Sequence, residues 1–238
     1  MADDADRDDD GDTAGGDHRS GHRRRLRDRF LKGGNDALHD YELLELMLFM
    51  AQPRRDMKPV AKALLDRFGG FAEVITADPE TLRRVPGVGD AAVAALKTAE
   101  AASIRLTREQ VDKRPVINSW DRLLDYCRTV LAHGRTERFH VLFLDQKNRL
   151  IADERQQEGT VDHTPLYPRE VVKRALDHGA CALILVHNHP SGDLKPSRAD
   201  VEMTRKVQEA ARPLGVTVHD HVVVGRTGHT SFKASGLL

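Results

Sequence analysis

An apolar run that ends in two histidines is the feature that most constrains the fold of this chain. The run extends from Cys181 to His187 and contains no charged residue. A short, continuously apolar segment is typical of a central strand that is covered on both faces. His187 and His189 are two residues apart, so their side chains point to the same face at the end of this strand.

The residues after the strand predict a tight loop that leads into a helix. Pro190 ends the strand ladder, and Gly192 permits a turn. Ser197 then opens a helix, with Asp200 in its first turn. A loop of this length can bring the carboxylate back onto the two imidazoles. Two histidines and one carboxylate leave one position of a tetrahedral zinc ion open, which is the ligand count of a catalytic site.

Each part of this pattern also has a structural interpretation. Histidines in strands are often only packed or hydrogen-bonded, and Ser197 with Asp200 is a good helix cap. Taken separately, the parts favour packing for the histidines and capping for Ser197 and Asp200. The complete order of residues from His187 to Asp200 is specific for a metal site. Capping and catalysis are compatible roles for the Ser197 hydroxyl.

The segments around this motif alternate between strands and helices. We expect strands at 139–145, 150–155, 181–187, 216–218 and 221–224, and helices at 168–178 and 198–212. Such alternation indicates an α/β sandwich over about residues 118–238.

Residues 23–110, in contrast, have helical periodicity throughout and predict a small all-helical domain. The segment from Val85 to Gly89 lies between two expected helices and resembles a helix-hairpin-helix. The backbone N–H groups of Gly87 and Gly89 would suit a DNA phosphate. Asp90 would repel it, and the same loop also packs helices in proteins that bind nothing.

Charge and composition define the remaining parts of the chain. Residues 1–17 hold eight Asp and one Arg without branched apolar residues, so we expect a disordered acidic tail. Residues 1–22 comprise this tail and the start of a basic cluster, and residues 111–117 are expected to be a linker. The cluster contains Arg19, Arg23, Arg24, Arg25, Arg27 and Arg29, either on a solvated helix face or at phosphates.

Several classes of protein are excluded by composition. No run of about 18 apolar residues exists, and the first residues do not resemble a signal peptide, so we expect a cytoplasmic protein without membrane contact. Cys127 and Cys181 are too few for a disulfide framework. We expect two buried thiols.

The motif resembles that of the JAMM metalloproteases of the MPN-domain type: His-x-His, seven residues, Ser, two residues, Asp. His187, His189, Ser197 and Asp200 stand at these intervals. Further segments resemble the bacterial RadC-like proteins within this group. They are residues 158–160, 167–170, 187–193 and 220–221, and the resemblance covers about residues 23–238.

The resemblance implies a mixed sheet, a Zn²⁺ ion held by His187, His189 and Asp200, and cleavage of a peptide or isopeptide amide in a protein substrate. It also implies that Ser197 donates a hydrogen bond to the oxyanion, and that a glutamate carries a proton from water to the leaving amine.

Three glutamates are candidates for that proton transfer. Glu154, in an expected strand, fits best; Glu158 is the competitor, and Glu170 resembles a helix-start residue.

A second hypothesis for the whole protein is a DNA-associated accessory protein whose metal site is structural or vestigial. The pair Asp220-His221 either supports a ligand imidazole or holds its strand in place.

Overall fold

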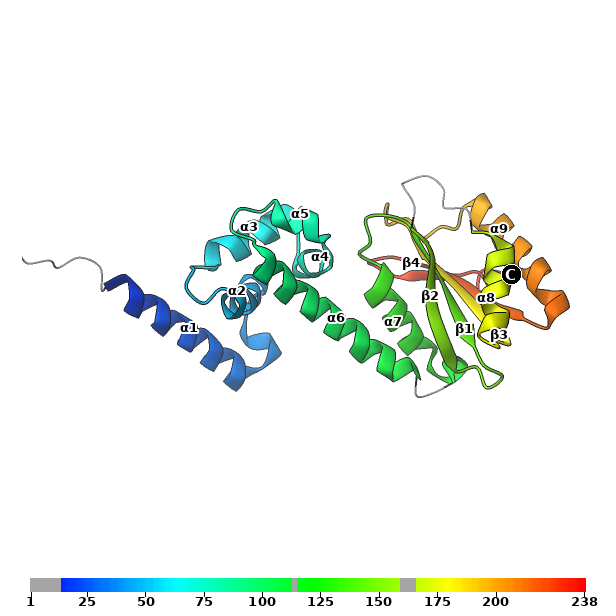
Figure 1. Cartoon of the computed structure of the whole chain (residues 1–238), viewed down its shortest axis with the longest axis horizontal. Helices are drawn as coiled ribbons and strands as arrows, with labels where there is room; N and C mark the ends of the chain where they lie inside the picture. Colours follow the sequence, from blue (N-terminus) through cyan, green and yellow to red (C-terminus); the bar gives the residue numbers. More distant parts are fainter. Residues whose placement is uncertain (1–13, 113–114, 159–165) are drawn as a thin grey trace, which may run out of the picture. The chain divides into compact units, whose positions relative to one another are not determined.

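The structure is a computed structural model that describes residues 14–112, 115–158 and 166–238 (Figure 1). The chain divides into two compact units, residues 1–98 and 99–238. Within the described residues, no helix combines the length and apolar character that a membrane crossing requires.

The first unit is helical, as predicted. Its elements are α1 (Ala14–Gly33), η1 (Asn35–Ala37), α2 (Asp40–Ala51), α3 (Lys58–Phe68), α4 (Phe71–Thr76), α5 (Pro79–Arg83) and the first part of α6 (Asp90–Asp112). Fully buried leucines from four helices form its core: Leu44, Leu48, Leu64, Leu82 and Leu96. Burial of these side chains is the main source of stability for such short helices.

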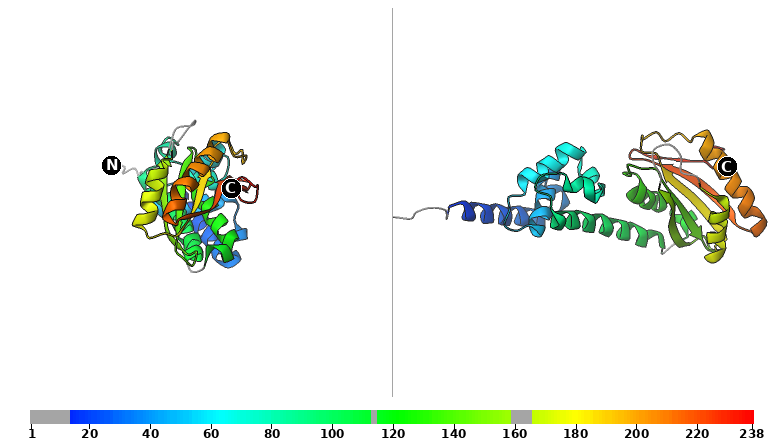
Figure 2. Two further views of the ribbon diagram at one scale, coloured as in Figure 1. Left: turned by 90° about the vertical axis from the view of Figure 1, so that its right-hand side faces the viewer. Right: turned by 45° about the horizontal axis from the view of Figure 1, so that its top comes forward.

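Two boundaries differ from the expectation. Helix α1 begins at Ala14, inside the segment expected to be disordered, while residues 1–13 lie outside the described residues. The division between the units falls after Thr98, inside the single helix α6, which continues to Asp112 (Figure 2). Val111 and Val116 lie within the expected linker, 111–117, but both are fully buried in the core of the second unit.

The second unit is an α/β sandwich with a mixed sheet, which confirms the predicted fold class. Its elements are η2 (Val116–Ser119), α7 (Trp120–Leu131), β1 (Arg138–Leu144), β2 (Leu150–Glu158), α8 (Pro168–Asp177), β3 (Ala182–Asn188), α9 (Arg198–Ala211), η3 (Arg212–Leu214), β4 (Thr217–Val224) and β5 (His229–Ser231). The strand order is β2-β1-β3-β4-β5, and only the β3–β4 pair is parallel.

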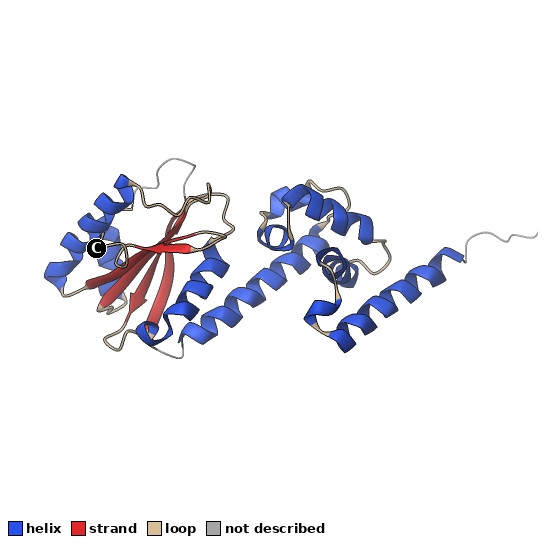
Figure 3. Cartoon of the chain, turned by 180° about the vertical axis from the view of Figure 1, so that it is seen from behind, coloured by secondary structure: helices blue, strands red, loops and turns tan. Residues whose placement is uncertain are grey.

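Strand β3 is the central strand, and all seven of its residues are buried. Helices α8 and α9 lie side by side over one face of the sheet, and α7 covers the other face (Figures 1, 2 and 3). The α8–α9 face contains Phe139, Val141 and Leu185, whereas Leu142 and Ile184 belong to the α7 face. The site therefore begins where a fully covered strand ends.

Strand β4 was expected as two short strands but is continuous, with a bulge at His219. Val218 pairs with Leu183 and Asp220 pairs with Ile184, so His219 is an extra residue between them. Such a bulge resets the side-chain alternation. As a result Val218 and His221 both face α8 and α9, and Asp220 faces α7.

Candidate metal centre

The structure brings His187, His189 and Asp200 together. His187 is the sixth residue of β3, His189 follows the strand directly, and Asp200 lies in the first turn of α9. The Nε2 atoms of the histidines are 2.9 Å apart, and each is 3.6 Å from an Asp200 carboxylate oxygen. Within the described residues, this is the one group of three or more such side chains with metal-binding spacing.

The loop between the histidines and the aspartate is held by local contacts. Gly192 has φ 81°, a left-handed conformation that glycine adopts without strain. Ser197 and Asp200 form a reciprocal cap: the Asp200 N–H donates to Ser197 Oγ, and the Ser197 N–H and hydroxyl both donate to Asp200 Oδ2 at 2.7 Å. Leu194 covers Gly225, where a Cβ would lie 2.7 Å from the leucine. These contacts fix where the carboxylate points.

A chain of hydrogen bonds extends behind His187 into the core. Its Nδ1 atom lies 2.8 Å from Nε2 of His221, and Nδ1 of His221 lies 2.7 Å from the Thr204 hydroxyl oxygen. That hydroxyl donates to the backbone carbonyl of Asp200 at 2.5 Å. His221 and Thr204 are buried, so water does not replace these partners.

This chain fixes the proton positions, because a carbonyl oxygen only accepts. Thr204 gives its proton to the carbonyl, so its oxygen accepts from Nδ1–H of His221. Nε2 of His221 then accepts from Nδ1–H of His187. In the neutral His187 ring, the Nε2 atom therefore has no proton and carries a lone pair. Burial lowers the pKa of His221 well below its usual value, so that this imidazole is neutral.

The same argument applies to His189, whose Nδ1 atom lies 2.6 Å from the carbonyl oxygen of Asp193. In the neutral ring, its Nε2 atom therefore also carries a lone pair. Two nitrogen lone pairs and a carboxylate that face one another repel unless a cation lies between them. The residues thus fit a divalent metal ion, with nitrogen and oxygen ligands of the kind Zn²⁺ takes.

The pKa shifts in the group agree with a cation site. Burial alone raises the pKa of Asp200, but hydrogen bonds from the His187 and His189 imidazoles, when these are protonated in place of a bound metal ion, and from Ser197 outweigh it and hold that pKa far below its usual range. The Asp200 carboxylate in turn raises the pKa of His189. The carboxylate therefore stays charged over the whole physiological range. His187 is fully buried, while the side chains of His189 and Asp200 are 17% and 12% exposed, so the site opens to solvent on one side.

Glu154, the predicted proton carrier, is bound elsewhere. Its carboxylate accepts from Arg174 Nε at 2.8 Å and contacts His178 Nε2 at 2.7 Å, at the C-terminal end of α8. The Arg174 hydrogen bond is the main cause that lowers the pKa of Glu154 to about 2. A carboxylate with so low a pKa is a weak base at neutral pH.

The strand register also separates Glu154 from the metal group. Glu154 is opposite Val141, which is opposite Leu185. His187 lies two residues further along β3, or about 7 Å, and β3 is two strands from β2, or about 10 Å. The predicted role of Glu154 in proton transfer is therefore not supported by its ion pair with Arg174 or by its distance from His187 in the sheet.

Glu158 is closer to the level of the metal group along the strand. It is opposite Arg138, the neighbour of Phe139, and Phe139 is opposite His187. Its side chain lies outside the described part of the structure. Glu170 is exposed in the first turn of α8, as expected for a helix-start residue.

The Asp220-His221 pair combines both of the roles that were considered. His221 contacts His187, as described above. Asp220 accepts from the backbone N–H groups of His221 and Lys233 and from the Ser231 hydroxyl, so it fastens β5 and the following turn to β4. Thr204 was missed by the sequence analysis, because a threonine inside a helix belongs to no recognisable motif.

The hairpin in the first unit has a structural explanation. Gly87 has φ 94°, and a Cβ there would lie 2.8 Å from a methyl group of Val60. Val85 and Val88 are buried on either side. Asp90 accepts from Arg83 Nε at 2.9 Å, so this arginine is partly neutralised. Gly89 is exposed, and DNA binding at this loop stays a prediction.

Comparison with known proteins confirms the resemblance. A family model described as a RadC-like JAB domain matches residues 117–237, and a model of the UPF0758 N-terminal domain matches residues 19–94. The chain belongs to the family of RadC-like JAB domain proteins.

Two relatives cover almost the whole chain. A UPF0758 protein of Rhodobacter capsulatus is 60% identical over 213 residues, which cover 90% of this chain and 100% of the relative. The UPF0758 protein SPO0054 of Ruegeria pomeroyi is 57% identical over 217 residues, 91% of this chain and 97% of the relative.

Proposed function

We propose that this protein is a zinc-dependent hydrolase of the JAMM type that cleaves peptide or isopeptide amides. The observation that carries the proposal is the convergence of Nε2 of His187 and Nε2 of His189 on the Asp200 carboxylate at the C-terminal end of β3, with 2.9 Å between the two nitrogens and 3.6 Å from each to a carboxylate oxygen. The net reaction adds water across the C–N bond and gives a carboxylic acid and an amine.

A zinc ion bound there supplies a Lewis acid and lowers the pKa of a water molecule. The chain's own residues do the rest. His187 is oriented by His221, and His189 is oriented by the Asp193 carbonyl, so neither ring needs to reorganise when the ion binds. Ser197 lies beside Asp200 and is exposed, which fits a hydroxyl that donates to the oxyanion after leaving its capping bond.

Two glutamates are candidates for the residue that carries the proton from water to the leaving amine. Glu154 is the residue that the family pattern favours, and Glu158 is the alternative that lies closer to the level of His187 along the strands. Glu154→Gln and Glu158→Gln variants distinguish them. The true base loses turnover while its zinc content stays unchanged, and the other variant keeps most of its turnover.

The first experiment is the zinc content of the purified protein by mass spectrometry, for the wild type and His189→Ala. About one zinc per chain, lost in the variant, supports the proposal and justifies a screen of peptide and isopeptide substrates. A wild type that takes up no zinc when it is supplied would refute it. The DNA-associated alternative would then come first, with salt-dependent DNA binding as its test.

A further inference from the structure

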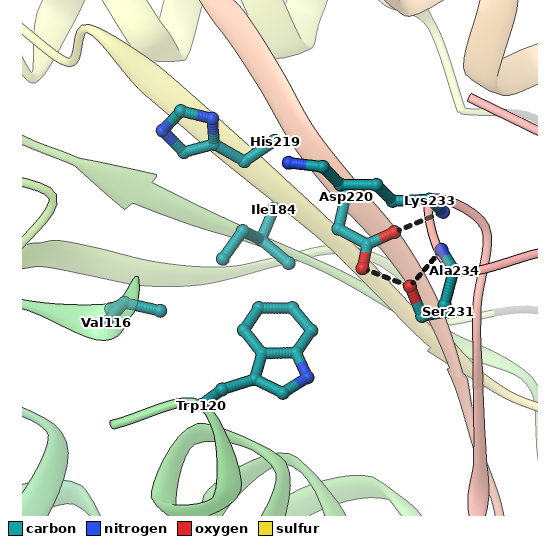
Figure 4. Close-up of a pocket in the computed structure, with 8 residues that line it drawn as sticks. All are labelled: Val116, Trp120, Ile184, His219, Asp220, Ser231, Lys233 and Ala234. Atoms are coloured by element: carbon teal, nitrogen blue, oxygen red, sulfur yellow. Dashed lines mark hydrogen bonds between the residues drawn. The ribbon is translucent and has the colours of Figure 1, made fainter. Parts of the chain in front are cut away.

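A pocket lies between the sheet and α7, on the face of the sheet opposite the candidate metal centre. It has a volume of about 340 Å³. Eight residues line it: Val116, Trp120, Ile184, His219, Asp220, Ser231, Lys233 and Ala234 (Figure 4). Its members come from η2, α7, β3, β4, β5 and the C-terminal turn, so it is built from segments far apart in the sequence.

The pocket has a buried, mostly apolar floor. Val116, Ile184 and Asp220 are 0%, 1% and 4% exposed, whereas Lys233 and Ala234 are exposed at its edge. Trp120 is half-buried and adds the flat face of an indole. Small-molecule sites in proteins have this character, with an apolar lining and a few polar groups that set the orientation.

The charged groups of the pocket differ in what they still offer to a ligand. The two oxygens of Asp220 already accept three hydrogen bonds, from the Ser231 hydroxyl and from the N–H groups of His221 and Lys233. In Figure 4 this carboxylate points toward Ser231 and the backbone of Lys233, not toward Trp120. These donors are neutral, so the carboxylate keeps its charge, but its hydrogen bonds are all directed to the His221 N–H group and the C-terminal turn and away from Trp120.

His219 is also engaged, because its Nε2 atom lies 2.6 Å from the Asn148 side-chain oxygen. The Lys233 ammonium is different. Its side chain extends past Asp220 toward His219 (Figure 4). Within the described residues, the Lys233 ammonium group has no acceptor or ion-pair partner. The bulge at His219 is what turns β4 so that Asp220 faces this pocket.

We propose that this pocket binds a small organic anion with a flat apolar body, an aromatic carboxylate being the simplest case. The flat body packs between Trp120 and the floor formed by Val116 and Ile184, and the anion pairs with Lys233. This inference does not depend on the metal centre, because His187 faces the opposite side of the sheet.

The chain contains a single tryptophan, so Trp120 reports on the pocket directly. Protein labelled with 5-fluorotryptophan is titrated with naphthalene-2-carboxylate, 2-naphthamide and 2-naphthylmethylammonium, and the one ¹⁹F resonance is followed. We expect a saturable shift with the carboxylate and binding of the amide that is about tenfold weaker, as for the loss of one charge-assisted hydrogen bond.

Matched variants locate the charge that is recognised. Lys233→Met should bind the carboxylate and the amide equally, whereas Lys173→Met, an exposed lysine on α8, should keep the preference. His189→Ala should also keep it, which separates this result from the fate of the zinc site. Three results would overturn the proposal: no shift at millimolar carboxylate, equal binding of the amide, or tighter binding of the cation.

Discussion

The hydroxyl of Thr204 contacts His221 behind the candidate metal centre, and we expect it to set the proton positions there; its replacement by valine tests this directly. The substitution keeps the shape of the side chain and removes the atom that accepts from His221. Thr204 is 1% exposed, so water does not take its place. His221 then gains by moving its proton to Nε2, which places a proton on Nε2 of His187, where the metal would bind.

The expected size of the effect follows from the buried donor. A buried N–H group without an acceptor costs about 1–3 kcal/mol, which corresponds to roughly 5- to 150-fold in a binding constant. Loss of a partner behind a metal ligand costs about 10- to 100-fold in metal affinity. We therefore expect Thr204→Val to raise the Kd for Zn²⁺ by about 10- to 100-fold, measured by competition with a chelating dye.

Thr129→Val is the matched control. The Thr129 hydroxyl makes the same bond to a carbonyl four residues earlier, at 2.8 Å, and contacts no imidazole. Thr204→Ser should restore affinity because it restores the hydroxyl. Equal zinc affinity for the Thr204→Val and Thr129→Val proteins would refute the argument from proton positions.

Three further predictions concern stability. Ser197→Ala removes the cap of α9 and should lower the free energy of unfolding by about 1 kcal/mol, as seen in chemical denaturation. Gly87→Ala should lower the melting temperature of the first unit more than Gly69→Ala, because both glycines have positive φ but only Gly87 has no space for a Cβ. Glu154 has a pKa lowered to about 2, so its ion pair with Arg174 stabilises the fold above its unfolded pKa of about 4.3 and is lost as the pH falls toward 2. Glu154→Gln should therefore be less stable than the wild type by about 1 kcal/mol at pH 7 and equally stable near pH 2, with thermal melts across pH as the measurement.

The convergence of His187, His189 and Asp200 could be predicted because their spacing in the sequence determines which way the side chains point. His187 and His189 share a face by strand alternation, and the Ser197–Asp200 cap returns the carboxylate to them. Glu154 was not predictable in the same way. Its partner Arg174 comes from the packing of α8 on the sheet, and no local pattern encodes which strand residue that helix meets.

Two elements of the second unit were also missed or misread. Helix α7 was not predicted, although Leu123, Leu124, Cys127 and Leu131 have the spacing of one helix face and are buried. Strand β4 was divided into two because His219 and Asp220 interrupt its apolar pattern. A bulge produces that interruption, and a rule that requires strict alternation ends the strand there.

The bulge has a consequence for how the length of this chain can vary. In a regular strand, the loss or gain of one residue exchanges the two faces for everything that follows. At His219 the strand already carries one residue more than the ladder with β3 requires. Removing that residue would leave Val218 beside α8 and α9, Asp220 facing α7 and His221 behind His187. Relatives of this protein can therefore differ in length by one residue at this position and keep both faces of the sheet in use.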